Sequence, residues 1–155
     1  MRRIRHAGDM RALAGKTVLV TGGARRVGAA ICRRLHGAGA NVVIHYRTSH
    51  RAAEQLRRQL EARRRGTTLC VRADLLDLDA LEGLVAAAVG HFGRLDAVVN
   101  NASSFYPTPL ATVTQAQWDD LVGTNLKAPL FLVQAAAPEL IRRRGAVVNI
   151  ADIHA

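Results

Sequence analysis

Residues 17–28, TVLVTGGARRVG, decide the fold of this chain. Residues 17–20 are apolar or β-branched and have the length of a buried strand. Gly22, Gly23 and Gly28 then allow a tight turn in which the backbone can approach a pyrophosphate, and the helix expected next would offer its N-terminal amides. Together, the strand, turn and helix predict a dinucleotide-binding unit, with a merely structural turn as the alternative.

The rest of the chain alternates apolar segments of strand length with segments of helical period, which predicts βαβ units. We therefore predict an α/β fold, a Rossmann-type doubly wound parallel sheet, incomplete, with about five strands and about four helices. Ser49 is expected to cap the second helix and Gly93 to end the third. A capping box at 114–117 is expected to open the last helix, with a bend at Pro129. The strands are expected at 17–20, 41–44, 67–71, 95–100 and 146–150.

The composition indicates one globular domain, residues 15–155, preceded by a basic tail, residues 1–14. Hydrophobic residues make up 49% of the 155 residues, which is enough to build a core. No apolar run has the length of a signal peptide or a membrane span. Cys32 and Cys70 have no spacing typical of zinc, redox or disulfide chemistry. We expect a cytoplasmic protein with no metal site and no membrane partner.

The net charge of +10 raises the question of nucleic-acid binding. Arginine carries most of this charge, in clusters at 57–58, 63–65 and 142–144. These clusters fall where helices are expected to end, and cations there complement the helix dipole. The sequence has no basic stripe interleaved with aromatic residues, so a solvated surface is the better interpretation and we predict no nucleic-acid partner.

The end of the second expected strand, which reads HYRTS at 45–49, discriminates between the two nicotinamide cofactors. NAD sites usually place Asp or Glu there to hold the ribose hydroxyls, and this stretch has no carboxylate. Arg26 and Arg47 can bring guanidinium groups to the 2′-phosphate of NADPH, while His45 and Ser49 can donate hydrogen bonds to it. We therefore predict NADPH as the cofactor; the alternative is that these residues are surface cations.

Polar groups also follow the third and fourth expected strands. Asp74 can accept a hydrogen bond from an adenine amino group while Leu75 packs on the ring; capping of the next helix is the alternative. Residues 100–107, NNASSFYP, lie where an open parallel sheet binds its ligands. They offer amides, hydroxyls and an aromatic ring that can stack on a flat heterocycle, with an ordinary loop as the alternative.

Taken in order along the chain, these residues resemble the signature of the short-chain dehydrogenase/reductase family. The chain shows Thr21-Gly22, then Asn-Asn-Ala-Ser at 100–103, then Asn125. Three departures from the general signature resemble the pteridine reductases within that family. They are Arg26 where a glycine is usual, Ser-Ser-Phe-Tyr-Pro at 103–107, and Asp152 where the catalytic serine is usual.

The resemblance implies roles for single residues. Arg26 would lie near both the cofactor phosphate and the pterin, and Ser103 would touch the cofactor near its nicotinamide. Phe105 would sandwich the pterin against the nicotinamide, and Asn125 would hold a water of the proton relay. Asp152 suits reduction of a C=N bond, where a proton must be delivered. The cofactor-binding residues would be Gly22, Arg26, Val27, Gly28, His45, Arg47, Ser49, Asp74, Leu75, Asn101, Ala102 and Ser103; the substrate-binding residues would be Arg26, Ser103 and Phe105.

The resemblance also implies NADPH-dependent reduction of dihydropterin or dihydrofolate-type substrates by hydride transfer, in a homo-oligomer, a dimer or tetramer. The family's Tyr-x-x-x-Lys pair does not occur, because Tyr46 and Tyr106 are the only tyrosines and neither has a Lys four residues on. We therefore expect a Rossmann domain truncated at its C-terminal end, inactive and prone to aggregate by itself. The alternatives are a short-chain carbonyl reductase for 3-oxoacyl or sugar substrates, and a non-catalytic NADP-binding fragment.

Overall fold

The computed structural model describes residues 12–151 and contains one parallel sheet in this part of the chain. The strands follow the order β3-β2-β1-β4-β5 and pair in parallel throughout. This confirms the expected Rossmann-type sheet. The strands are β1 (Thr17–Val20), β2 (Asn41–Tyr46), β3 (Thr68–Arg72), β4 (Ala97–Asn100) and β5 (Ala146–Asn149).

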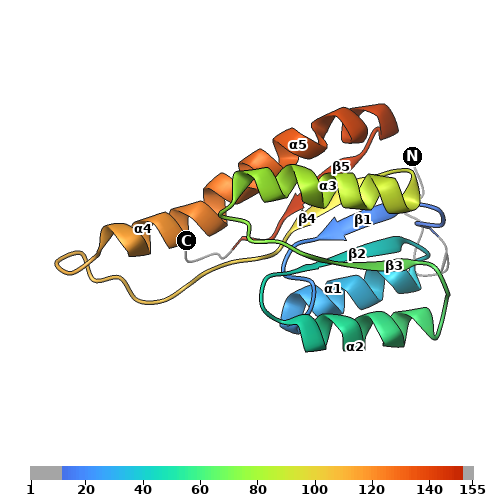
Figure 1. Cartoon of the computed structure of the whole chain (residues 1–155), viewed down its shortest axis with the longest axis horizontal. Helices are drawn as coiled ribbons and strands as arrows, with labels where there is room; N and C mark the ends of the chain where they lie inside the picture. The colour runs from blue at the N-terminus through green and yellow to red at the C-terminus, as the bar shows by residue number, and fades with distance from the viewer. Residues whose placement is uncertain (1–11, 152–155) are drawn as a thin grey trace, which may run out of the picture.

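Helices cover both faces of the sheet (Figure 1). The helices α1 (Arg26–Gly37) and α2 (His50–Glu61) lie on one face, where Cys32, Leu56 and Leu60 join a core with side chains of β1 and β2. The helices α3 (Leu78–Phe92) and α5 (Ala128–Arg143) lie on the other face and enclose a second core. Because both faces are covered, the strands read as apolar runs and not as alternating patterns.

The order of the strands reverses beside β1. The chain builds outward from β1 to β2 and β3, then crosses to the other side of β1 to form β4 and β5. Val18 of β1 lies opposite Val42 of β2 on one side and Ala97 of β4 on the other. In open α/β sheets the crevice at such a reversal, at the carboxyl ends of the strands, is where ligands bind.

A buried carboxylate joins the beginnings of β1 and β4. The side chain of Asp96 accepts hydrogen bonds from the backbone N–H of Thr17 at 2.9 Å and from the guanidinium of Arg94 at 2.6 and 2.7 Å. Lys16 lies 3.2 Å from the same carboxylate. Although burial opposes the charge, these hydrogen bonds lower the pKa of Asp96 to about 2.

A second carboxylate holds the turn between α2 and β3. Glu61 accepts hydrogen bonds from the backbone N–H groups of Gly66, Thr67 and Thr68 at 2.6 to 2.9 Å, and from the Thr68 hydroxyl at 2.6 Å. Burial opposes the charge of this group too, yet the four donors lower the pKa of Glu61 to about 2. The arginines at 63–65 therefore follow the helix α2, whose last residue, Glu61, fixes the turn through its carboxylate.

The helix ends partly follow the sequence signals. Gly93 ends α3 in the left-handed conformation with φ of 71°, and Thr114 and Gln117 form the expected capping box of α4 (Gln115–Val122). Ser49 precedes α2 but its side chain makes no capping hydrogen bond. The irregular part of the long helical stretch is a π-helical turn, η1 (Gly123–Lys127), and it comes before Pro129. Pro129 lies in the first turn of α5, directly after this π-helical turn.

The strand β5 lies at the edge of the sheet, paired only with β4 within the described residues. All four of its residues are exposed, and Val148 retains 47% of its surface. In the region from 12 to 151, no helix is long and apolar enough to cross a membrane.

Candidate functional site

A cavity of about 1190 Å³ opens at the carboxyl ends of the central strands, where the strand order reverses. Its lining comes from the turn after β1, the ends of β2 and β3, the loop after β4, and η1, α5 and β5. Among the lining residues are Gly22, Arg25, Arg26, Val27, Gly28, His45, Arg47, Asp74, Leu75, Asn101, Ala102, Ser103, Ser104, Phe105, Thr124 and Asn125.

The turn between β1 and α1 is packed too closely for side chains at its glycines. A Cβ at Gly28 would lie 2.2 Å from the carbonyl oxygen of Gly22 and 2.7 Å from Nδ2 of Asn101. Gly22 itself has φ of 60°, which favours glycine, and its Cβ would lie 3.1 Å from Cα of Ala102. The backbone therefore forms the cavity wall directly, and no side chain caps the N-terminus of α1 in the described structure. Uncapped helix N–H groups beside a bare backbone turn suit the phosphates of a dinucleotide.

Hydrogen bonds tie this turn to the loop after β4. The hydroxyl oxygen of Thr21 accepts the backbone N–H groups of Asn101 and Ala102 at 2.9 and 3.0 Å. In return, the Asn101 side-chain amide donates to the carbonyl oxygens of Thr21 at 2.9 Å and Gly22 at 3.3 Å. The two walls of the cavity thus form one hydrogen-bonded unit, and Asn101 acts through its side chain as a brace.

His45 is buried inside the protein, whereas the sequence predicts that it donates a hydrogen bond to the 2′-phosphate of the cofactor. Its ring is 2% exposed; Nδ1 accepts the backbone N–H of Gly22 at 3.1 Å, and Nε2 lies 3.2 Å from the carbonyl oxygen of Ala73, to which it donates. Both ring nitrogens are therefore used inside the protein, which leaves no N–H for a phosphate. Burial lowers the pKa of His45, so the neutral ring that accepts from Gly22 is favoured. His45 braces the glycine turn.

Arginines gather where the turn after β1 and the end of β2 line the cavity. Arg25, Arg26 and Arg47 line it, and Asp74 is the only carboxylate among the described lining residues. Arg47 lies 3.9 Å from Asp74, with both side chains about half exposed. Asp74 also accepts the backbone N–H of Leu76 at 3.1 Å. The capping alternative for Asp74 is wrong, because Asp77 caps α3.

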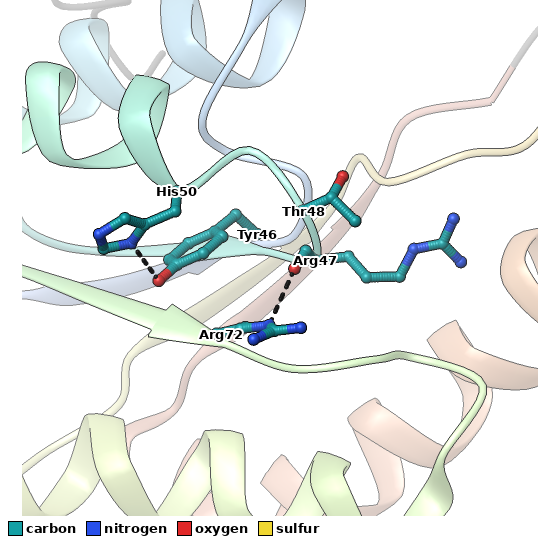
Figure 2. A pocket seen from close by; sticks show the side chains of 5 residues that line it. All are labelled: Tyr46, Arg47, Thr48, His50 and Arg72. Atoms are coloured by element: carbon teal, nitrogen blue, oxygen red, sulfur yellow. Dashed lines mark hydrogen bonds between the residues drawn. The ribbon is translucent and has the colours of Figure 1, made fainter.

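Beside the end of β2 lies a smaller pocket of about 540 Å³, shown in Figure 2. The hydroxyl of Tyr46 is hydrogen-bonded to Nδ1 of His50 at 2.8 Å, and Arg72 donates to the backbone oxygen of Arg47 at 3.2 Å. The guanidinium of Arg47 points away from Tyr46 and His50 (Figure 2) and reaches the larger cavity. Ser49 lines neither pocket. The two pockets are therefore contiguous at Arg47, and the smaller one is basic.

The loop after β4 forms another wall of the cavity. Ser103 and Phe105 both line the cavity, and the Phe105 side chain is 92% exposed. Asn125 of η1 binds this loop through its amide, donating to the backbone oxygen of Ser104 at 2.8 Å and accepting its N–H at 3.2 Å. The side-chain amide of Asn125, which the resemblance expects to hold a water, is thus already hydrogen-bonded to the backbone of Ser104. Asp152, the predicted proton donor, lies outside the described residues.

The comparisons with known proteins place this chain in a family. A family model described as short chain dehydrogenase matches residues 16–155. The chain belongs to the short-chain dehydrogenase family.

Among its relatives is pteridine reductase 1 of Leishmania tarentolae, 34% identical over an alignment 172 positions long, which covers 86% of this chain and 60% of the relative. A 3-oxoacyl-[acyl-carrier-protein] reductase, FabG, of Staphylococcus aureus is 33% identical over 140 residues, 89% of this chain and 56% of the relative. This short-chain dehydrogenase therefore spans little more than half the length of these curated relatives.

Two solved structures resemble the fold closely. One is a metagenomic short-chain oxidoreductase in complex with NADP, with a TM-score of 0.84 and 35% identity, covering 91% of this chain and 64% of that one. The other is a short chain dehydrogenase from Burkholderia cenocepacia in complex with NADP, with a TM-score of 0.79 and 38% identity, covering 83% of this chain and 52% of that one.

Sequence reasoning brought most of the site together but missed several residues. Every candidate site residue other than Gly23, Ser49 and Asp152 lines the large cavity. Arg25, Arg72 and Ser104 were missed. Arg72 gave no local signal, because its place opposite Tyr46 arises from the pairing of β2 with β3. The apolar side, with Leu126, Leu130 and Val147, follows from helix packing that no local pattern encodes.

Proposed function

We propose that the whole protein reduces pterins with NADPH, by hydride transfer to a C=N bond. The observation that carries this proposal is the shared cavity, in which a basic end with an uncapped helix N-terminus adjoins a wall bearing an exposed phenyl ring. NADPH, when bound, supplies the hydride. Because the chain spans 56% to 60% of its curated relatives, we propose the activity for the whole protein.

The preference for NADPH rests on charge at the end of β2. No carboxylate follows β2 to hold ribose hydroxyls, whereas Arg26 and Arg47 line the cavity there. The Arg47 guanidinium has only a 3.9 Å pairing with Asp74, so a phosphate can compete for it. That the two solved relatives hold NADP supports the same assignment.

Calorimetric titration with NADPH and with NADH tests the cofactor assignment. We expect NADPH to bind at least about tenfold more tightly, because a charge-assisted hydrogen bond contributes about 1.5–3 kcal/mol. Arg47→Glu should remove most of this preference. Arg58→Glu, on α2 and outside both pockets, is the matched control and should leave it intact. Equal binding of both cofactors that Arg47→Glu does not change would contradict the assignment.

The substrate class rests on the wall opposite the cofactor end. An exposed phenyl ring, a serine hydroxyl and a guanidinium suit a flat heterocycle with many hydrogen-bonding edges. In this proposal Phe105 stacks on the pterin while Ser103 and Arg26 bind its edges. Asp152, in its protonated form, gives its proton to the C=N nitrogen and becomes a carboxylate, while the adjacent carbon accepts the hydride. The pteridine reductase among the relatives supports this choice.

A carbonyl reductase is the second candidate, because 3-oxoacyl reductases are also among the relatives. Against it stand Phe105, whose exposed ring suits a flat heterocycle, and Asp152, which occupies the place of the serine hydroxyl that usually donates to a ketone oxygen in this family. NADPH consumption with dihydrobiopterin and with a 3-oxoacyl thioester separates the two candidates. For the 155-residue chain alone we expect NADPH binding without turnover, because its two tyrosines, Tyr46 and Tyr106, lack the family's paired lysine.

A further inference from the structure

The two neighbours of Phe105 are bound to one carboxylate. The hydroxyl of Ser104 donates to Oδ1 of Asp120 at 3.3 Å, and the hydroxyl of Tyr106 donates to Oδ2 of the same residue at 3.1 Å. Asp120 lies on α4, outside the cavity lining. The loop segment that carries the phenyl ring is therefore fixed from behind, on both sides of the ring.

The phenyl ring of Phe105 itself packs against little of the protein. Phe105 is 92% exposed, so packing does not decide where its ring lies. Its position depends on the backbone between Ser104 and Tyr106, which the Asp120 carboxylate spans. At one end of this segment, the side-chain amide of Asn125 is hydrogen-bonded to the backbone N–H and carbonyl oxygen of Ser104. At the other end, Tyr106 has the Asp120 carboxylate as its hydrogen-bond partner.

The helix that carries Asp120 is itself positioned against the cavity. A Cβ at Gly123 would lie 2.5 Å from Cδ2 of Leu76, so the helix packs tightly on the loop that follows β3. The π-helical turn begins at this glycine and brings Thr124, which is 8% exposed, within 3.5 Å of the Ser104 hydroxyl. The carboxylate that holds the loop thus sits on a helix fixed to the adenine side of the cavity.

The negatively charged carboxylate of Asp120 is suited to accept hydrogen bonds from two hydroxyl groups. Among the described residues no cation forms an ion pair with Asp120, so its two oxygens serve the two hydroxyls. An ionised carboxylate accepts two such hydrogen bonds at once, and an amide offers a single oxygen. The adjacent Asp119 provides a natural comparison, because it accepts instead from Gln115 on the same helix at 2.8 Å.

We propose that Asp120 is a positioning residue that sets where Phe105 presents its ring and thereby determines the affinity for flat substrates. This rests on the proposed function for the identity of the substrate. The position of the anchor itself rests only on the contacts of Ser104 and Tyr106.

The test compares Asp120→Asn with Asp119→Asn, which removes the same charge from the next residue. Binding of dihydrobiopterin is measured on the chain saturated with NADPH, and binding of NADPH is measured separately. We expect Asp120→Asn to weaken dihydrobiopterin binding about tenfold, and to change NADPH binding by less than about twofold. Asp119→Asn should change neither. Tyr106→Phe should weaken pterin binding and add little further loss in the Asp120→Asn background.

Two readouts do not depend on a pterin. Burial, together with the hydrogen bond to Asp120 and its charge, raises the pKa of Tyr106, so ultraviolet titration should show a lower tyrosine pKa in Asp120→Asn but not in Asp119→Asn. Chymotrypsin should also cut after Phe105 severalfold faster in Asp120→Asn, because the segment has lost its anchor.

These readouts separate failure of the inference from failure of the proposed function. If the unsubstituted chain binds NADPH but no dihydrobiopterin, the proposed substrate is wrong, and the cleavage rate and tyrosine titration decide whether Asp120 anchors the loop. The inference is overturned if Asp120→Asn leaves both of those unchanged. It is also overturned if dihydrobiopterin binds and its affinity is the same in Asp120→Asn and in the unsubstituted chain.

Discussion

At the scale of single residues, Arg26 combines a functional charge with an unfavourable backbone. Its φ is 47°, in the left-handed region that favours glycine, and the family signature has a glycine at this place. A non-glycine residue there costs about 1–2 kcal/mol. The guanidinium that this residue brings to the cavity is therefore obtained at the expense of stability, a pattern common at binding sites.

We predict that Arg26→Gly stabilises the fold while it weakens cofactor binding. Relief of the left-handed conformation should raise the free energy of unfolding by about 1 kcal/mol, or the melting temperature by about 2–4 °C. Loss of the guanidinium should weaken NADPH binding about tenfold. Arg25→Gly is the matched control, because Arg25 has an extended backbone with φ of −140° and gains no such relief. A destabilised Arg26→Gly variant with unchanged NADPH affinity would refute this account of Arg26.

Single residues also show which features of the site the sequence predicts and which it does not. Gly22, Gly28, Arg26 and Arg47 were predictable, because their places just after a strand have a physical meaning for phosphate binding. The role of His45 was not, since its ring is enclosed by Gly22 and by Ala73, which is 28 residues away along the chain. A local sequence pattern predicts which residue type lies at a position, but it does not predict which group forms the hydrogen bond with that residue.

At the scale of elements, two carboxylates set the ends of strands. Asp96 joins the beginnings of β1 and β4, and Glu61 fixes the turn that leads into β3. Asp96 is buried and Glu61 is partly buried, and hydrogen-bond donors hold the pKa of each at about 2, against 3.8 for an ordinary Asp and 4.5 for an ordinary Glu. A pKa lowered by folding means that the folded state binds fewer protons than the unfolded state between these values.

We predict the resulting acid dependence of stability. The contribution of these carboxylates should be complete above pH 4.5 and should be lost as the pH falls toward about 2. Urea unfolding as a function of pH measures this. Asp96→Asn should lower the free energy of unfolding near neutral pH by about 1–3 kcal/mol and make the acid decline shallower. The exposed Asp119→Asn is the control. An unaltered acid decline in Asp96→Asn would show that this carboxylate does not link β1 to β4.

Which elements exist was largely readable from the sequence, whereas their order in the sheet was not. Apolar runs and helical periods are local, so all five strands appear near their predicted places. Strand order arises from pairings such as Val18 with Ala97, which join distant segments. The partners that depend on this order were missed, among them Arg72 beside β2 and Asp120 behind the Phe105 loop.

At the scale of the whole molecule, apolar surface is concentrated at one edge. β5 has all four residues exposed, and Leu126, Leu130 and Ile141 of the neighbouring helical stretch are each more than half exposed. A sheet edge with unpaired backbone groups and apolar side chains favours association. This surface supports the proposal that the chain by itself associates.

We predict that Val148→Lys reduces this association. The lysine places a charge on the edge strand, which opposes pairing with a second edge. Sedimentation velocity of the chain should show a mixture of species that shifts toward the monomer in Val148→Lys. Leu110→Lys adds the same charge at a residue that is 93% exposed in the loop before α4, and it should have no effect. A purely monomeric unsubstituted chain would contradict the prediction.

The central claim is that one cavity holds NADPH and a flat pterin together. The most direct measurement is calorimetric titration of dihydrobiopterin into the chain, with and without saturating NADPH, and with Phe105→Ala beside it. The account predicts that dihydrobiopterin binds when NADPH is present, binds much more weakly without it, and loses at least about tenfold in affinity in Phe105→Ala. Pterin binding that is indifferent to both NADPH and Phe105, or no pterin binding to the NADPH-saturated chain, would contradict it.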